Sequence, residues 1–514
     1  MEPCTAVEPA PFIRSVATAC IVSVLLTGPA HTADTVRNED LLWLERVTYG
    51  VDATTLQQFR RLGRSRFLRA QLAMGGDPLP PRVAQQVAAL RISNADATQL
   101  LAEVNAASQQ INGLGDESAR QAARKTLNDT ANQLAYEAAR RHLLFALYSP
   151  AQLREQLVWF WLNQFSVFQG KGMIRWLLGD YEAQAIRPNA LGNFRDLVLA
   201  TLRHPAMLQY LDNAQNAAGH VNENYARELM ELHTLGVDSG YTQQDVQELA
   251  RILTGVGINA TGSEPKLKPE WQKLYVHRGA FEFNPARHDS GTKTLLGRRF
   301  EPGGMDEVEA AIDWIIAQPA CARFVSRRLA EYFLGTEPSP ALLDRMARTF
   351  HHDHGNIAAL LRTLVESREF SASLGKAFKD PMHFVVSSLR TAYDGNVIEN
   401  MRPVMNWLNA LGEPLYGRQT PDGYPLLESG WTSSGQMSRR FEIARAIASG
   451  NAGLFVPEGG GTATIGGFPQ IANRLFFEQR QPQLSAATQS ALARAESQQE
   501  WNTYVLSSPE FNHR

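Results

Sequence analysis

The sequence predicts a mainly α protein with one large helical domain and a small β-hairpin and loop region inserted at residues 258–304. Apolar residues recur at helical spacing over most of the chain, in segments rich in Ala, Leu, Gln and Arg. Only residues 258–304 differ, because Pro, Gly and Lys are frequent there and apolar residues alternate. No fixed-period repeat or clear linker divides residues 34–514, so we expect a single domain.

Residues 1–33 have the pattern of a secretion signal. Arg14 precedes an apolar run over residues 15–27, and small residues up to Ala33 offer cleavage sites. The run is short for a membrane span, although an uncleaved anchor is the alternative. Of the three cysteines only Cys321 follows this segment, so the mature chain has no internal disulfide. We expect a periplasmic or secreted protein without a transmembrane span in the mature chain.

The charge balance argues against a nucleic-acid partner. The formal net charge is −2, and no basic stripe runs along the chain. The sequence also contains no phosphate-binding Walker loop, no dinucleotide GxGxxG motif after a strand and no GxSxG nucleophile elbow. The Gly-rich stretch at 459–467 contains no Lys for a phosphate loop, so we expect an ordinary loop.

The elements follow in order from local patterns. In the aromatic helix at 153–168, we expect Asn163 and Gln164 to be buried amides that cap backbone groups. A turn at Ser290-Gly291 with the β-prone residues 292–296 predicts a hairpin. The helices are predicted at 82–148 with short interruptions, 153–168, 194–202, 205–211, from 223 to Gly236, from the capping box at Thr242 to 253, and within 305–370, 377–409 and 437–448.

The acidic helix beginning near Glu223 is the most informative segment for function. At about 100° per residue, Asn224, Glu228 and Glu231 share one stripe, with Arg227 beside it. His233 points to the apolar side, where we expect a core histidine bonded to a backbone carbonyl. The alternative for the two carboxylates is a solvated helix face that pairs with Arg227.

Two carboxylates on one face suit general acid–base chemistry when burial raises the proton affinity of one of them. Glycosidic bond cleavage uses such a pair, usually placed across a cleft, so a third carboxylate should lie opposite. The candidates for it are Asp180, Asp212 and Asp289. We therefore predict Glu228, Glu231 and Asp289 as the catalytic residues, with no cofactor required.

Substrate binding is assigned to polar and aromatic residues. Asn224 and Arg227 would orient the substrate or the carboxylates. Tyr424 and Trp431 stand in polar, loop-like sequence, where exposed rings would stack on sugar faces, although local packing is the commoner role of such residues. The predicted partner is a polysaccharide or another envelope polymer.

A metal site is the alternative. His288 and Asp289, brought against Glu228 and Glu231, would supply imidazole and carboxylate ligands for a divalent metal. No HExxH or comparable ligand spacing supports this set. The plainer interpretation is that His288 and Asp289 organise the hairpin turn.

Blocks of residues spread along most of the mature chain resemble a known family. They are Leu44–Gly50, Phe160–Phe165, Ile186–Pro188, Gly192–Leu197, His204–Met207, Tyr210–Asn213, Asn222–Gly236, Tyr241–Asp245, Leu253–Gly255, His288-Asp289 with Lys293, and Pro421–Tyr424 with Trp431. The chain is similar in these blocks to the bacterial family called domain of unknown function 1800.

The resemblance implies a secreted or periplasmic, mostly helical bacterial protein, and it implies no reaction. Members of the family tend to carry His where this chain has Gln164. If that His is a ligand or a general base, this chain has an altered or impaired site.

The predicted function is an exported hydrolase of the glycoside hydrolase type, acting on an extracellular or envelope polysaccharide. The alternatives are a metal-dependent enzyme and a non-catalytic envelope assembly or binding protein. In the last case the acidic helix is a buried polar network that serves the structure.

Overall fold

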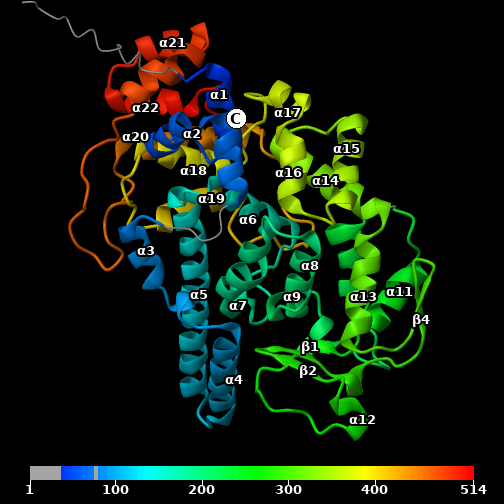
Figure 1. Ribbon diagram of the computed structural model, residues 1–514. Coiled ribbons are helices and arrows are strands. Elements are labelled where there is room, and N and C mark those ends of the chain that lie inside the picture. The colour runs from blue at the N-terminus through cyan, green and yellow to red at the C-terminus, as the bar shows by residue number, and fades with distance from the viewer. Residues whose placement is uncertain (1–35, 74–78, 238) are drawn as a thin grey trace, which may run out of the picture. The chain divides into compact units, whose positions relative to one another are not determined.

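Helices dominate the computed structural model, which describes residues 36–514 except 74–78 and 238 (Figure 1). The mainly α prediction is confirmed. The predicted signal peptide at 1–33 lies outside the described residues. Residues 36–514 form one compact unit by their internal contacts. Within the described part of the chain, no helix has the length and apolar character needed to cross a bilayer.

The N-terminal half contains the helices α1 (Asn38–Val47), α2 (Ala53–Ala73), α3 (Pro81–Ala88), α4 (Ala97–Gly113), α5 (Glu117–Tyr148), α6 (Gln152–Gln164), α7 (Ile174–Asp180), α8 (Phe194–Leu202), α9 (Pro205–Tyr210), α10 (Asn224–Glu228) and α11 (Gln243–Ile252). Between them lie the 3-10 turns η1 (Arg91–Ser93), η3 (Arg187–Asn189) and η4 (Asn213–Gln215) and the π-helical segments η2 (Tyr181–Ile186) and η5 (Leu229–Thr234). The bounds of α8 match the predicted helix at 194–202, and Thr242 begins α11 with the predicted capping box.

The C-terminal half contains α12 (Pro269–Gln272), α13 (Met305–Ile316), α14 (Pro319–Leu334), α15 (Pro340–His352), α16 (Ile357–Val365), α17 (Arg368–Ser373), α18 (Pro381–Ala392), α19 (Arg402–Ala410), α20 (Ser434–Ser449), α21 (Ala486–Ala493) and α22 (Gln498–Ser507). Its short segments are η6 (Pro285–Arg287), η7 (Glu428–Gly430), η8 (Phe476–Arg480) and η9 (Gln481–Gln483). The stretch at 459–467 is an irregular loop, as predicted.

The strands lie where the composition changes. β1 (Val256–Ile258), β3 (Phe281–Phe283) and β2 (Val276–Arg278) form an antiparallel sheet in that order, and β4 (Lys293–Leu295) pairs with β5 (Arg298–Phe300). The hairpin turn is Leu296-Gly297 and not the predicted Ser290-Gly291. Both turn residues have positive φ, 47° and 74°, which a two-residue hairpin turn of the primed type requires.

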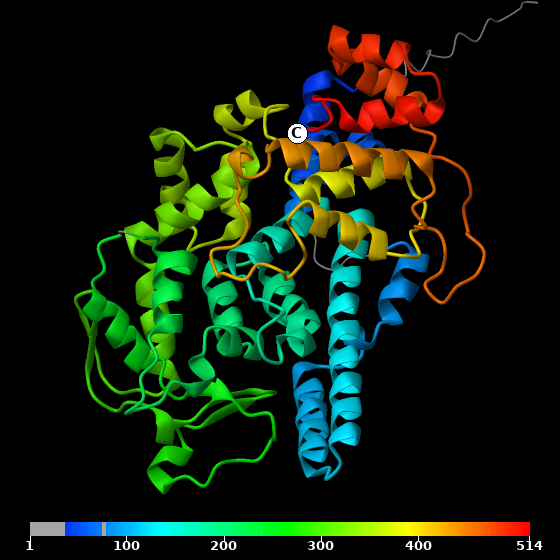
Figure 2. The ribbon, with the colours of Figure 1, turned by 180° about the vertical axis from the view of Figure 1, so that it is seen from behind.

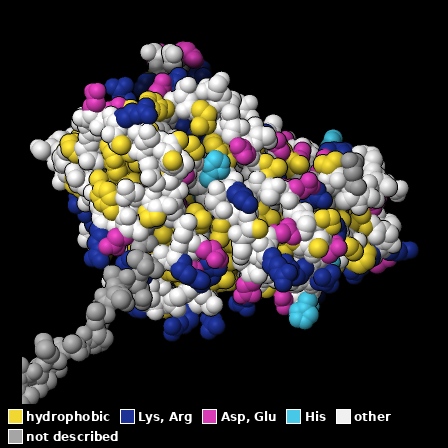
Figure 3. All heavy atoms as spheres, turned by 90° about the horizontal axis from the view of Figure 1, so that it is seen from above, with side chains coloured by type: hydrophobic (Ala, Val, Ile, Leu, Met, Phe, Trp, Pro, Cys, Tyr) yellow, Lys and Arg dark blue, Asp and Glu magenta, His cyan; other side chains and the backbone are white. Residues whose placement is uncertain are grey.

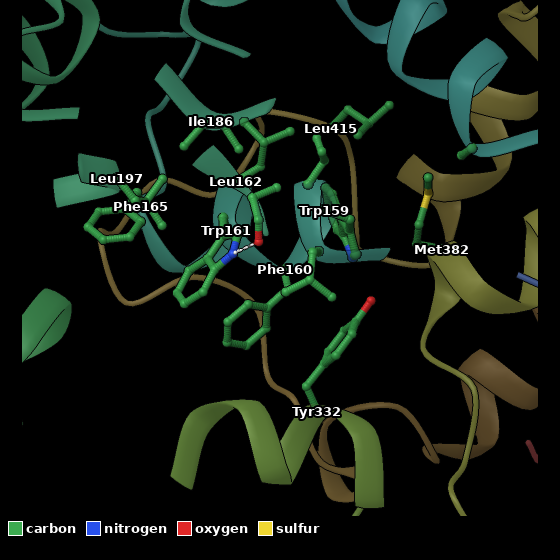
Figure 4. Packing of buried hydrophobic residues seen from close by; sticks show 14 of the residues in the cluster. Trp159, Phe160, Trp161, Leu162, Phe165, Ile186, Leu197, Tyr332, Met382 and Leu415 are labelled. Atoms are coloured by element: carbon green, nitrogen blue, oxygen red, sulfur yellow. Dashed lines mark hydrogen bonds between the residues drawn. The ribbon is translucent and has the colours of Figure 1, made fainter. Parts of the chain in front are cut away.

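Helix α6 runs through the core and positions the candidate site at its C-terminal end. Nearly every residue of α6 is buried, the aromatic residues at its centre as well as the polar residues near its two ends (Figure 4). The Phe160 ring lies 4.6 Å from that of Trp161 and 5.2 Å from that of Tyr332 on α14. Each buried aromatic side chain of this kind stabilises the fold by roughly 1.5–3 kcal/mol. The last residues of the helix, Asn163 and Gln164, are therefore held on a rigid support.

The surface carries both signs of charge. On the face shown in Figure 3, Lys and Arg side chains are mixed with Asp and Glu side chains. This mixture agrees with the formal net charge of −2.

Candidate functional site

The acidic segment is not one uninterrupted α-helix. α10 ends at Glu228 and continues as the π-helical segment η5. The Thr234 hydroxyl donates to the carbonyl oxygen of Leu229 at 2.6 Å, and the Leu235 amide donates to that of Met230 at 2.9 Å. The wider turn displaces residues after 228 from the stripe that α-helical geometry predicts. Single π-helical turns are rare and are frequent at functional sites.

Glu228 is half-buried and retains its proton more strongly than an ordinary glutamate. Burial raises the pKa of Glu228, repulsion from Glu231 and Asp422 raises it further, and Arg227 opposes the shift. The charges of Glu228 and Glu231 therefore interact, whereas their cooperation in catalysis stays a prediction. Asp422 joins the pair from another part of the chain.

Glu231 lines a cavity of about 330 Å³, whereas Glu228 lies outside its wall. The residues that line this open cavity come from η5 and the turn after it, the C-terminal end of α6, helix α14 and the loop between α19 and α20. Its lining residues are Gln164, Glu231, Leu232, Val237, Phe324, Arg328, Arg418, Asp422, Gly423, Tyr424 and Pro425.

Asn163 attaches the loop between α19 and α20, orange in Figure 2, to α6. Its Oδ1 accepts from the Tyr424 amide at 2.6 Å, and its Nδ2 donates to the Tyr424 carbonyl at 3.0 Å. Gly423 has a φ of 73°, and a Cβ there would meet the Asn163 carbonyl oxygen at 2.4 Å. The close approach requires glycine and places the preceding Asp422 at the cavity.

Asp422 and Arg418 form a two-bond pair on this loop. The Arg418 Nε and Nη2 atoms donate to the Asp422 carboxylate at 3.1 and 2.7 Å. Burial alone would raise the pKa of Asp422, but the bonds from Arg418 and Thr420 lower it overall. Asp422 is thus a stable anion beside the proton-retaining Glu228.

Gln164 caps a backbone group as predicted and also lines the cavity. Its Nε2 donates to the Leu232 carbonyl in η5, and its Oε1 accepts from Arg328 Nε at 3.1 Å. Gln164, where the family resemblance led us to expect His, therefore lies at this cavity.

Tyr210, the last residue of α9, also interacts electrostatically with Glu228 and Asp422. Its hydroxyl donates to the Gln419 carbonyl at 2.8 Å. Burial and the nearby carboxylates of Glu228 and Asp422 raise the pKa of Tyr210 to about 12. The phenol therefore stays protonated and acts as a hydrogen-bond donor.

Arg227 and Asn224 organise the acidic segment. The Arg227 guanidinium donates to Glu231 at 3.4 Å, to Glu223 at 3.1 Å and to Gln243 at 2.8 Å. Asn224 Nδ2 donates to the Leu211 carbonyl at 3.2 Å. Arg227 thus orients a carboxylate of the site, whereas Asn224 attaches the helix start to the chain after α9.

The predicted exposed aromatic platform is wrong. Trp431 is 3% exposed, and its Nε1 donates to the Pro425 carbonyl at 3.0 Å. Tyr424 is 7% exposed, donates its hydroxyl to the Pro414 carbonyl at 2.7 Å and packs against Trp159. The turn-rich sequence around them folds over α6 and buries both rings. Tyr424 nevertheless lines the cavity.

His288 and Asp289 belong to a different cluster, so Asp289 is not the partner of Glu228. The Arg251 guanidinium binds Asp289 at 2.9 and 3.1 Å and lowers its pKa. His288 Nε2 lies 3.1 Å from Glu307 Oε2, and Lys293 Nζ lies 2.9 Å from Glu307 Oε1. We call these five residues the Glu307 cluster.

The other carboxylates considered as partners are paired elsewhere. Asp212 pairs with Lys171 at 2.7 Å, and Asp180 with His204 at 2.9 Å. The carboxylate from a distant part of the chain that does act on the pKa of Glu228 is Asp422.

The alternative metal-ligand set is not assembled. Glu228 and Glu231 lie at the acidic segment, while His288 and Asp289 lie in the Glu307 cluster. Over residues 36–514, leaving out 74–78 and 238, no three His, Cys, Asp or Glu side chains are arranged to hold a metal ion.

His233 is a core histidine, as predicted. Its ring packs 4.9 Å from that of Phe165, and burial lowers its pKa to about 3. The predicted bond to a backbone carbonyl is absent, because neither ring nitrogen has a hydrogen-bond partner among the described residues.

Four residues of the site escaped sequence reasoning: Tyr210, Arg328, Arg418 and Asp422. Tyr210 and Asp422 lie within the resembling blocks Tyr210–Asn213 and Pro421–Tyr424, which could have drawn attention to them. Arg328 and Arg418 lie in no such block and show no local signal.

Of the comparisons with known proteins, only the comparison with family models gives a match. No curated protein matches the chain, and no solved structure matches it. A family model described as protein of unknown function (DUF1800) matches residues 42–513, nearly the whole chain. The protein therefore belongs to the DUF1800 family, as its resembling blocks predicted.

Proposed function

We propose that the protein is an exported hydrolase that cleaves a polysaccharide by carboxylate acid–base catalysis. One observation carries the proposal: half-buried Glu228 has a raised pKa beside Glu231 and Asp422, both of which line a cavity. Groups whose surroundings separate their pKa values are the usual acid and base of hydrolytic sites.

The roles follow from the charges. Glu228, protonated more readily than an ordinary glutamate, is the proposed proton donor to the leaving glycosidic oxygen, and its side chain must turn toward the cavity to do so because it lies outside the cavity wall. Glu231 or Asp422 takes the part of the anionic partner that activates water or stabilises the developing positive charge on the sugar. Asp422 replaces the predicted Asp289 in this scheme. Arg227 keeps Glu231 in position.

Export is part of the proposal. It is supported by the basic residue Arg14, the apolar run at 15–27 and the small residues after it, the order found in secretion signals. A secreted or periplasmic enzyme would meet extracellular or envelope polysaccharides directly.

The decisive experiment compares Glu228→Gln with the wild type on a panel of polysaccharides, scored by release of reducing ends. Removing a general acid lowers turnover by about 10²–10⁴-fold. The matched control is Glu442→Gln on α20, which removes an exposed carboxylate far along the chain. The proposal fails if folded Glu228→Gln keeps the activity of the wild type, or if the wild type cleaves none of the panel.

A non-catalytic envelope protein is the second candidate, and Arg227 favours it. This one guanidinium bonds three side chains of the acidic segment and α11, as in a polar network that stabilises structure. In that case Glu228→Gln changes the melting temperature and no catalytic rate.

A further inference from the structure

The cavity contains one cationic group that its neighbours do not fully neutralise. Arg418 is occupied by the two bonds to Asp422. Arg328 Nε donates to the neutral amide oxygen of Gln164, and its Nη1 reaches Glu331 only at 3.5 Å. Its Nη2 makes no hydrogen bond to any residue that the structure describes, and the side chain is 24% exposed.

The carboxylates that line the cavity already have cationic partners. Glu231 accepts from Arg227, and Asp422 accepts from Arg418. Neither of them bonds to Arg328. A bound anion would therefore meet the Nη2 atom of Arg328 beside the 3.5 Å contact of Nη1 with Glu331, and it would leave the pairs of Glu231 and Asp422 intact.

Another part of the lining is apolar. It consists of Leu232, Val237, Phe324 and Pro425, together with the ring of Tyr424. A sugar that carries an acid group matches both parts, because its C–H face packs against apolar side chains and its charge meets the arginine.

We propose that Arg328 makes the site selective for an anionic polysaccharide by binding the carboxylate of a uronic acid residue. This inference rests on the proposed function and names its substrate class. A carboxylate carries one negative charge and can accept a charge-assisted hydrogen bond from Nη2, the guanidinium nitrogen of Arg328 to which no described residue is hydrogen-bonded. Gln164 holds the guanidinium plane through Arg328 Nε. Arg328 is thus a specificity-determining residue, and Gln164 a positioning residue.

Binding without turnover tests the inference directly. In the Glu228→Gln background, calorimetry compares trimers of galacturonate, glucuronate and mannuronate with their methyl esters, which keep the sugar skeleton and lose the charge. We expect at least one acid trimer to bind about tenfold or more tightly than its ester. Arg328→Gln should abolish this preference, and Arg328→Lys should keep only part of it.

Arg327→Gln is the matched control, because Arg327 is the adjacent residue of α14 and pairs with Glu337 outside the cavity. It should leave the preference for the acid form unchanged. If Arg328→Gln does not fold, the reduced preference of Arg328→Lys is the deciding measurement. The inference is overturned if no acid trimer binds better than its ester, if the Arg328 variants keep the full preference, or if a sulfated trimer of equal charge binds as tightly.

The two proposals fail separately. If the acid trimers bind through Arg328 while the wild type cleaves no polysaccharide, the hydrolase proposal is wrong and the specificity of the cavity stands. If the wild type cleaves neutral polymers at a rate that Arg328→Gln does not alter, the hydrolase proposal stands and the anionic substrate is wrong.

Discussion

Two regions of this protein contain carboxylates that the sequence analysis proposed for catalysis, Glu228 and Glu231 in the acidic segment and Asp289 in the Glu307 cluster. In the acidic segment, Glu228 lies beside two other carboxylates near a cavity, and its pKa is raised. In the Glu307 cluster every carboxylate has a cationic partner. Burial alone would raise the pKa of Glu307, but hydrogen bonds from His288 and Lys293 lower it overall.

The difference shows that a carboxylate paired with a buried cation serves the stability of the fold, whereas a carboxylate without such a cation is suited to acid–base chemistry. Lys293 and Glu307 are completely buried and hold each other 2.9 Å apart. A buried pair of this kind fixes its surroundings and exposes no group to a substrate. Among the described residues no cation forms a salt bridge with Glu228, and its raised pKa favours the protonated form that a general acid needs.

The largest expected effect tests the structural role of the Glu307 cluster. Lys293→Met removes the cation and leaves Glu307 buried, so the free energy of unfolding should fall by about 3–5 kcal/mol. Chemical denaturation measures the loss, and Lys273→Met, at an exposed lysine, is the control. If the free energy of unfolding falls by less than about 1 kcal/mol, the Lys293–Glu307 pair contributes no more than a surface salt bridge, and the structural role of the Glu307 cluster is wrong.

Asp289→Asn should have a smaller effect in the same direction. Arg251 and Asp289 are each about one-quarter exposed, so their two-bond pair should contribute about 1 kcal/mol. Because Arg251 lowers the pKa of Asp289, this contribution is present above the ordinary pKa of 3.8 and is lost as the pH falls through the lowered value. Unfolding of the wild type and the variant at several pH values measures it, and a contribution that grows toward acid pH contradicts the pairing.

Glu228→Gln should have the smallest effect on stability, with the opposite sign. Removing the repulsion from Glu231 should raise the free energy of unfolding by roughly 0.2–0.5 kcal/mol at neutral pH. Because the folded-state pKa of Glu228 is raised, wild-type stability relative to the variant should fall as the pH rises from 4.5 through the raised value. A destabilised variant would instead assign Glu228 a structural role like that of Glu307.

Local patterns account for most of the elements. Helical periodicity and capping signals located α8 and the start of α11, and the change in composition located the strands. These signals involve neighbouring residues, so a sequence displays them directly. The hairpin turn was misplaced because Ser290-Gly291 and Leu296-Gly297 both contain a glycine, and only the pairing of β4 with β5 selects the second.

Only part of the candidate site could be predicted from the sequence, because its other residues come from distant parts of the chain. Glu228 and Glu231 stand three residues apart, so helical geometry alone puts them near each other. Asp422 joins them from nearly two hundred residues away, because Asn163 holds the loop and Gly423 permits the close approach. The burial of Tyr424 against Trp159 of α6 likewise depends on a residue from a distant part of the chain.

By itself, the sequence determined the helical class, the region of the strands, the acidic segment and the family. Each of these depends on local residue patterns or on short sequence blocks that resemble the family. Only the tertiary structure decided which charges meet. It assigned Asp289 to Arg251, Glu307 to Lys293, and Asp422 to the neighbourhood of Glu228. The physical reason is that the pKa and the role of a carboxylate depend on burial and on charges within a few ångströms, and those neighbours come from distant parts of the chain.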